Sequence, residues 1–429
     1  REAIWLCSSE RLAETQFLQL GVCAVLCAES RLQMASEDAA VSRGRTGRSD
    51  DRGYRRLGAL LTFGALLVVL TILRVSRLTA ILATVLAVLL VVATQDVFTA
   101  VDDQGVMSFF ALLWRYRNTD FVAFRAKHAQ HFQLAEETNN YVPAVCHYYQ
   151  LMSDLITLTS GPLWHFVPMP KGLTRKQCHE QFNHVVVKKL QAVPDDRILE
   201  FGCGFGEIGR QVAHLSGARV TGLTIADEEI AGGNERIARA GLQDQCEMVQ
   251  GNYHKMPFEA NTFSKVFGIY TLKYSHSLDE AFAELARVLK PGGLLMAYEI
   301  RCTDKYDAGN SLHRDYMYHI SFSTGMPPLW PGASFREAAE KAGLVLKEEV
   351  DLCNAENAWY ACFERTGIYS ILRSTVIKQL VRLAEALHLV PRDFSGFYDD
   401  HLVHPTVDFV EGGRLGIIDG AVLMLWQKP

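Results

Sequence analysis

The stretch that decides the fold is Arg197–Gly206, which reads Arg-Ile-Leu-Glu-Phe-Gly-Cys-Gly-Phe-Gly. A short, mostly apolar run leads into alternating glycines, and a helical pattern follows from about Glu207. In a strand–turn–helix unit, such glycines let the backbone approach a ligand and leave the first helical N–H groups free to bind it. The stretch therefore predicts a nucleotide-type binding loop, with a tight turn that holds no ligand as the alternative.

The residues after this loop alternate between strand and helix patterns. We expect Asp227 to cap a helix that runs to Ala240, with Gly241 ending it. An amphipathic helix is expected over Gly367–Leu389, and a turn at Lys290–Gly293. This alternation predicts an α/β fold with a doubly wound parallel sheet and one late antiparallel strand. The expected strands are Arg197–Phe201, Arg219–Leu223, Glu247–Gln250, Lys265–Tyr270, Leu294–Tyr298, Leu344–Val350 and Ala421–Trp426.

Composition narrows the classes of partner. The chain has 429 residues, 49% of them hydrophobic and 21% charged, with a net charge of −5. No basic face accompanies a nucleic-acid-binding motif, so no nucleic-acid partner is expected. The ten cysteines show no paired CxxC spacing and no His/Cys ligand set. We therefore predict no metal site and no disulfide framework, as in a reducing compartment.

The N-terminal third predicts membrane attachment. We expect residues 1–56 to be a disordered tail and 57–95 to be a transmembrane helical hairpin, because two uncharged runs flank Arg74 and Arg77. A re-entrant hairpin is the alternative. Six arginines before the hairpin should stay in the cytosol, which predicts a membrane protein whose catalytic part faces the cytosol, at the endoplasmic reticulum. Residues 96–140 are expected to form an interfacial helical connector in contact with membrane lipid.

The glycine loop resembles the first motif of Rossmann-like class I methyltransferases, which bind S-adenosylmethionine (SAM). Further motifs make the chain similar to the sterol methyltransferase family. The resemblance implies a methyltransferase domain over 141–360, a C-terminal sterol-binding segment over 361–429 that completes the sheet, and a sterol substrate. The motifs that carry it are Tyr148-Tyr149, His165-Phe166, His254–Phe258, Asn261–Phe263, Val288–Gly293, Tyr298-Glu299, Thr303–Asp307, Glu411–Ile417 and Gln427–Pro429.

SAM needs three kinds of contact, and the resemblance implies where each lies. The loop glycines admit its methionine end. Thr224 and Ile225 stand where most such enzymes carry a ribose-binding acid, and Asn252 stands where adenine is bound, with a turn residue as the alternative. The residues expected to bind SAM are Tyr149, Glu200, Gly202, Cys203, Gly204, Gly206, Thr224, Ile225, Asn252, Tyr253 and Tyr270.

The family's side-chain enzymes methylate carbon 24 by attack of an alkene on the SAM methyl group. Here the family's acid after the fourth strand is replaced by Tyr270, and its histidine by Tyr274. Because residues of the sterol-binding part differ from the family while the SAM-binding motif is kept, the sequence suggests methylation at carbon 4 of the sterol nucleus, as in nematode-type relatives. That reaction needs a base, for which His165, His276 and Glu299 are candidates. It also needs donors to a ketone oxygen, for which Tyr270, Tyr274 and Lys273 are candidates.

Two rival functions remain at this point. The chain could methylate another lipid or a quinone, although the C-terminal Glu411–Ile417 segment counts against this. It could also be a sterol-binding pseudoenzyme, because the acid at position 270 and the acid directly after the second strand are missing.

Overall fold

The computed structural model describes residues 116–160, 165–353, 357–365 and 368–429. The predicted tail, the predicted hairpin at 57–95 and the first part of the predicted connector lie outside these residues. Within the described part, no helix combines the length and the apolar content that a bilayer crossing needs.

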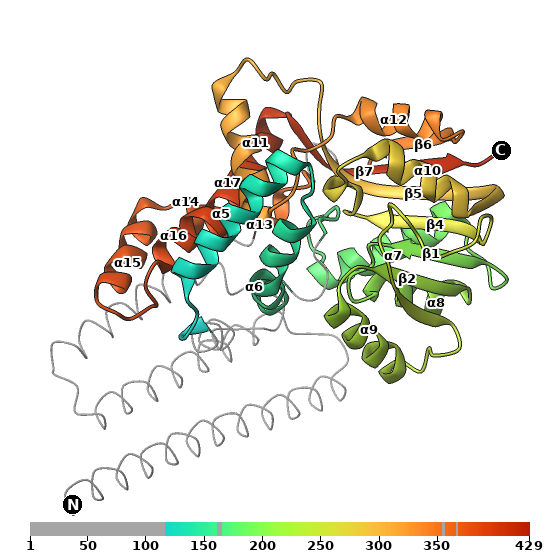
Figure 1. Ribbon diagram of the computed structural model, residues 1–429, viewed down its shortest axis with the longest axis horizontal. Helices are drawn as coiled ribbons and strands as arrows, with labels where there is room; N and C mark the ends of the chain where they lie inside the picture. Colours follow the sequence, from blue (N-terminus) through green and yellow to red (C-terminus); the bar gives the residue numbers. More distant parts are fainter. Residues whose placement is uncertain (1–115, 161–164, 354–356, 366–367) are drawn as a thin grey trace, which may run out of the picture. The chain divides into compact units, whose positions relative to one another are not determined.

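A mixed seven-stranded sheet lies at the centre of the described chain (Figure 1). The strand order is β3-β2-β1-β4-β5-β7-β6, and β7 runs antiparallel between β5 and β6. The predicted doubly wound sheet with one late antiparallel strand is confirmed. The strands are β1 (Arg197–Phe201), β2 (Arg219–Thr224), β3 (Cys246–Gln250), β4 (Phe263–Ile269), β5 (Leu289–Cys302), β6 (Val345–Asp351) and β7 (Ile418–Gln427).

Helices cover both faces of the sheet. Successive residues of a strand point to opposite sides, so neighbouring residues of β1 belong to two different cores. Ile198 of β1 packs in a core with side chains of α7 and α8. The next residue, Leu199, belongs to a second core with α10 and α12. Burial on both faces explains why consecutive residues such as Ile198 and Leu199 are both apolar in β1. These helices and the one after β2 are α7 (Arg175–Leu190), α8 (Glu207–Ser216), α9 (Asp227–Arg239), α10 (Leu278–Val288) and α12 (Gly332–Lys341).

A group of helices packs beside the sheet (Figure 1). Helix α5 contacts α6, and α11 contacts α17. Phe121 of α5 packs on Phe394 and Phe397 of α16, with ring centroids 5.3 and 4.7 Å away. The group therefore joins the segment before the sheet to the C-terminal segment. Its helices are α5 (Phe121–Thr138), α6 (Val142–Ser160), α11 (Ser311–Thr324), α13 (Ala361–Arg365), α14 (Ile368–Arg373), α15 (Thr375–Ala386), α16 (Phe394–Tyr398) and α17 (His404–Leu415).

Two local predictions are wrong, and a third is met inside a strand. The helix expected at Gly367–Leu389 is interrupted at Ser374, whose hydroxyl accepts the Ile377 N–H and so starts α15 as a new helix. Asp227 does not cap α9: it is the first helical residue, and its carboxylate accepts a hydrogen bond from Gln250. The turn expected at Lys290–Gly293 is present as an irregularity inside β5: Leu289 pairs with Phe263 and Leu294 with Lys265, and Gly292 between them has φ +77°.

Candidate functional site

The glycine loop after β1 has the conformation that close ligand approach requires. Gly202, Gly204 and Gly206 all have left-handed backbone, with φ of +64°, +54° and +67°. A Cβ on Gly202 would lie 2.3 Å from Thr271 Cγ2, so the loop sits directly against the residue after β4. A Cβ on Gly204 would meet only Glu229 Oε1, at 3.9 Å. The open side of the loop, at the start of α8, is therefore where the methionine end of SAM is expected to bind.

Glu200 in β1 and Cys203 in the loop hold the glycine loop in place through contacts inside the protein. Glu200 is buried, and its carboxylate accepts the Gly209 N–H at 2.9 Å, which ties β1 to α8. Burial raises the pKa of Glu200 to about 8. The sulfur of Cys203 faces Gly222 of β2, where a Cβ would come within 2.9 Å of it. Both residues therefore shape the loop, and their contact with SAM stays a prediction.

An acid that sequence reasoning missed stands beside the loop. The hydroxyl of Thr224, at the end of β2, donates to the carboxylate of Glu229 in the first turn of α9. Glu229 is half-buried, which raises its pKa, whereas Ile225 is exposed. A carboxylate can accept two hydroxyl hydrogen bonds, as a ribose offers. The signal was the acid-rich first turn of α9, which folds back onto the strand end.

Asn252 and Tyr253, which follow β3 and are both predicted to bind SAM, lie in different environments. Asn252 is exposed and its side-chain oxygen accepts the His254 N–H at 2.9 Å, which is the turn role. Tyr253 turns inward and donates to the Thr271 carbonyl at 3.4 Å. Of the two, Tyr253 therefore supports the wall of the loop, while Asn252 stays at its rim.

The residues that follow β4 are held by one buried carboxylate. Glu299 of β5 is fully buried, and its Oε1 accepts the N–H groups of Thr271 at 2.9 Å and Leu272 at 2.7 Å. Its Oε2 has no hydrogen-bond partner among the described residues. Burial raises the pKa of Glu299, against the effect of these N–H groups and of Lys273. Glu299 thus fixes the 3₁₀ turn Leu272–Tyr274.

Lys273 lies between two aromatic rings. Its Nζ is 4.9 Å from the ring centroid of Tyr270 and 4.9 Å from that of Tyr274. Burial lowers the pKa of Lys273, and the nearby charge of Glu299 opposes this. An amine with a depressed pKa can lose its proton near neutral pH and act as a base.

A tyrosine pair connects this turn to α6. The hydroxyls of Tyr149 and Tyr274 are 2.5 Å apart, and either can be the donor. Burial raises the pKa of Tyr149 to about 12 and that of Tyr274 well above its ordinary value, so both are neutral donors. The charge of Glu229 also raises the pKa of Tyr149. Tyr149 therefore links the loop side of the site to the Lys273 side.

Tyr270 and His165 form part of an aromatic wall. Tyr270 has left-handed backbone (φ +55°), donates its hydroxyl to the Gly420 carbonyl and stacks on Tyr298 at 5.7 Å. The His165 ring lies 6.3 Å from that of Tyr270, and burial lowers the pKa of His165 well below its usual value. The structure thus gathers His165 and Tyr270 beside Lys273, although the Tyr270 hydroxyl is already bound to a backbone carbonyl.

His276 is the one predicted catalytic residue that faces elsewhere. Its Nε2 lies 3.1 Å from a Glu280 carboxylate oxygen, and its ring stacks on that of His254 at 4.0 Å. It is not the helix cap either, because Ser277 caps α10. The structure places His276 with this surface group rather than with Glu299.

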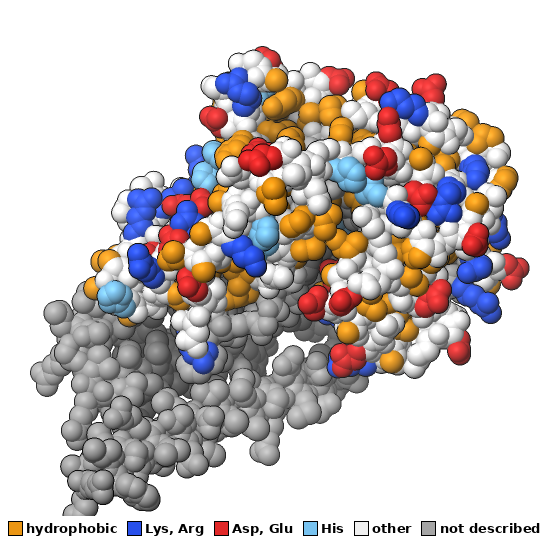
Figure 2. Space-filling model, in the orientation of Figure 1, with side chains coloured by type: hydrophobic (Ala, Val, Ile, Leu, Met, Phe, Trp, Pro, Cys, Tyr) orange, Lys and Arg blue, Asp and Glu red, His pale blue; other side chains and the backbone are white. Residues whose placement is uncertain are grey.

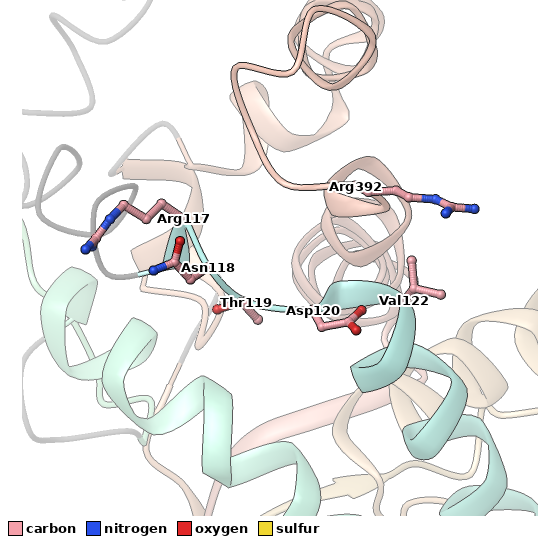
Figure 3. Close-up of a pocket in the computed structure, with 6 residues that line it drawn as sticks. All are labelled: Arg117, Asn118, Thr119, Asp120, Val122 and Arg392. Atoms are coloured by element: carbon pink, nitrogen blue, oxygen red, sulfur yellow. The ribbon is translucent and has the colours of Figure 1, made fainter. Parts of the chain in front are cut away.

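The hollow shown in Figure 3 is not built for a sterol. It has a volume of about 450 Å³ and is polar: its lining includes Asp120, which caps α5, and Arg392. None of the predicted site residues lines it. The remaining lining residues are Arg117, Asn118, Thr119 and Val122.

The sheet order and the glycine loop define a class I SAM-dependent methyltransferase. A methyltransferase-domain family model matches residues 199–297. A solved [4+2]-cyclase, SpnF, shares the fold, with a TM-score of 0.50 and 18% identity over 66% of this chain and 93% of that one.

Relatives narrow the class. The sterol 4-C-methyltransferase of Caenorhabditis elegans is 34% identical over 75% of this chain and 97% of its own length. A sterol 24-C-methyltransferase of Debaryomyces hansenii is 29% identical over 68% of this chain and 81% of its own. The chain belongs to the sterol methyltransferase family, and it is an enzyme that uses SAM to methylate a sterol. The rival prediction of a pseudoenzyme is not supported by these similarities. The rival prediction of another lipid or a quinone as substrate has one parallel, a squalene methyltransferase of Botryococcus braunii that is 32% identical over 66% of this chain and 75% of its own length.

Proposed function

We propose that this enzyme transfers the SAM methyl group to carbon 4 of a 3-keto sterol. The observation that carries the proposal is the partly buried Lys273, whose Nζ lies 4.9 Å from the ring centroids of both Tyr270 and Tyr274, beside a pair of neutral hydroxyls. Alkene attack at carbon 24 needs no such base in its first step. The 34% identical relative is named a 4-C-methyltransferase, which supports the same choice.

Lys273 removes the proton in this mechanism. Its neutral amine takes a proton from carbon 4 of the ketone, and the electron pair of that C–H bond moves into an enolate. SAM, when bound, supplies an electrophilic methyl group, and the new carbon–carbon bond forms as the methyl–sulfur bond breaks. Lys273 then returns its proton to water. Lys273, which the sequence suggested as a donor, suits the base role better than the predicted base His165, whose buried imidazole is too weakly basic.

The tyrosine pair stabilises the developing oxyanion. When the Tyr149 hydroxyl donates to the Tyr274 oxygen, the Tyr274 hydroxyl proton can be directed at the ketone oxygen. The flanking rings of the aromatic wall lower the polarity of the surroundings, which strengthens that hydrogen bond. Phe166 contributes to this wall, with its ring 5.8 Å from Tyr270 and 5.2 Å from Trp359.

Product analysis tests the proposal. The purified full chain is incubated with isotopically labelled SAM and, separately, with a 3-keto sterol or a sterol that carries a carbon 24 alkene. We expect label at carbon 4 of the ketone, located by NMR and mass spectrometry. Label on the side chain, or equal turnover of a 3-hydroxy sterol that cannot form an enolate, would overturn the carbon 4 assignment.

We also propose that the enzyme works on a membrane, where its sterol dissolves. Helix α15 has no buried residue. The apolar side chains of Val376 and Leu383, and of Leu387 at its C-terminal cap, are 68%, 53% and 57% exposed. Their spacing places them on one helical face. Figure 2 shows hydrophobic side chains beside basic ones in the region of α15. A helix of this kind suits the boundary between headgroups and acyl chains.

The predicted hairpin at 57–95 would add an anchor, with the catalytic domain on the cytosolic face of the endoplasmic reticulum. Carbonate extraction and protease protection test this in cells: we expect the chain in the membrane pellet and its C-terminal domain open to protease. Vesicle binding of a chain without residues 1–95 tests α15 separately. Leu383→Glu should weaken that binding, and Leu312→Glu, at an exposed leucine of α11, serves as the control.

A further inference from the structure

Two imidazoles and a carboxylate meet where α11 packs on α17. His319 comes from α11, whereas His404 and Asp408 lie one turn apart on α17. The Nδ1 atoms of His319 and His404 are 2.8 and 3.5 Å from the same oxygen of Asp408. The two imidazole centroids are 4.1 Å apart. Three potential ligand atoms thus converge from two helices, and all lie within 4.8 Å of one another.

We propose that His319, His404 and Asp408 bind a late first-row divalent metal ion such as Zn²⁺. Zinc bonds of about 2.0–2.1 Å in a tetrahedron separate neighbouring ligand atoms by about 3.3 Å. The two observed separations from the Asp408 oxygen lie on either side of that value. Two imidazole nitrogens and one carboxylate oxygen favour zinc, cobalt, nickel or copper over magnesium or calcium.

Burial and charge both favour a cation here. Asp408 is 5% exposed, and among the described residues its ion-pair partners are these two histidines rather than a lysine or arginine. Both histidines are half-exposed, which leaves an open side for water as the fourth ligand. Asp315 and Asp400 add negative charge near His319. A buried carboxylate that faces only imidazoles is well suited to share a metal ion with them.

A second group offers similar ligands in a weaker arrangement. His254, His276 and Glu280 also lie close together, and within the described ranges they and the α11–α17 group are the groups with metal-ligand potential. The Glu280 side chain is 61% exposed, so it can swing into solvent. The Nε2 of His254 is already hydrogen-bonded to the Ser275 hydroxyl at 3.2 Å. This group therefore provides the control rather than the proposed site.

The consequence of metal binding would be structural. Helix α17 leads directly into β7, and the side chains of α17 and α11 share one core with the aromatic wall. A metal ion that joins His319 to His404 would fasten these helices to each other. The expected effect is therefore a gain in thermal stability, whatever the metal does to turnover.

The test uses the full chain, purified without a histidine tag and stripped with a chelator. Co²⁺ is titrated and its visible d–d absorption followed, and Zn²⁺ is titrated by calorimetry. We expect one tight site with tetrahedral Co²⁺ absorption and a rise in Tm with Zn²⁺. His404→Asn and Asp408→Asn should each weaken binding by at least about tenfold, because each removes a ligand. His276→Asn should leave it unchanged.

Three results would overturn the proposal: no saturable binding by the wild type, binding that survives His404→Asn, or binding lost on His276→Asn. Circular dichroism of the metal-free variants separates lost ligands from lost fold. If Asp408→Asn unfolds, His404→Asn still decides the question, because the His404 side chain is half-exposed.

Discussion

Replacing Lys273 with methionine is expected to lower the rate of carbon 4 methylation by about 10²–10⁴-fold, the usual contribution of a positioned general base. The side chain keeps its length and can still pack between the rings of Tyr270 and Tyr274, so the aromatic wall should persist. Affinity for SAM should change by less than about twofold, since the cation–π partners of Lys273 are these rings and not the glycine loop.

The control for this variant is Lys273→Arg. Arginine retains the positive charge over the two rings but does not deprotonate in proteins, so it cannot serve as the base. If Lys273 acts only as a cation or a donor, the arginine variant should retain most of the activity. If Lys273 is the base, both variants should be equally slow.

The pH dependence separates the two roles further. A neutral amine is the active form, so kcat/KM should rise with pH through the pKa of Lys273 and then level off. The charge of Glu299 raises that pKa against the effect of burial. Glu299→Gln removes the charge but keeps an oxygen for the N–H groups of Thr271 and Leu272. The rising limb should therefore move to lower pH.

The rate of the chemical step is measured by single-turnover methylation of a 3-keto sterol at saturating SAM, and kcat/KM by steady-state turnover of the same sterol. Product is measured by mass spectrometry and SAM affinity by calorimetry. Full carbon 4 methylation by Lys273→Met, or an unchanged pH limb in Glu299→Gln, would refute the base assignment. A tenfold loss of SAM affinity in Lys273→Met would instead show that Lys273 belongs to the cofactor site.

Three further predictions concern the loop and the helix pair. Glu229→Gln should weaken SAM binding by about 10–100-fold in calorimetry, the cost of about 1.5–3 kcal/mol for a hydrogen bond to a charged group, while the exposed neighbour change Glu228→Gln should not. Gly202→Ala should destabilise the fold by about 2–5 kcal/mol in urea unfolding, because the new Cβ adds left-handed strain and clashes with Thr271. The control is Gly292→Ala, where φ is +77° but an added Cβ would meet no atom within 4 Å, so the cost should be only about 1–2 kcal/mol. The third prediction concerns the metal-free protein, kept in chelator, in which the hydrogen bond to Asp408 raises the pKa of His319. The proton bound to His319 therefore stabilises the fold below the unfolded pKa of about 6.5. This stability is lost as pH rises through the folded pKa. The Tm difference between wild type and Asp408→Asn should shrink accordingly from pH 5.5 to pH 8.5, and a constant difference would contradict the coupling.

Local sequence determined the sheet and the cofactor loop. The run Arg197–Gly206 encodes its strand, its three left-handed glycines and its helix start within ten consecutive residues, so no distant contact is needed to read it. Gly241 likewise ends its segment with left-handed backbone, as predicted. The prediction of a continuous helix over Gly367–Leu389 failed because it used apolar periodicity alone. The Ser374 hydroxyl caps a new helix within that range.

The tertiary structure decided which side chains meet. Glu229 reaches the loop because the first turn of α9 folds back over the end of β2, and Tyr149 meets Tyr274 across 125 positions of sequence. His319 and Asp408 are 89 positions apart and belong to no spacing motif. Periodicity records which face of an element is buried, but it does not record which faces of distant elements touch. The cofactor class was therefore readable from one short segment, whereas the base, the donors and the proposed metal ligands depend on packing between helices and strands that the chain brings together only when folded.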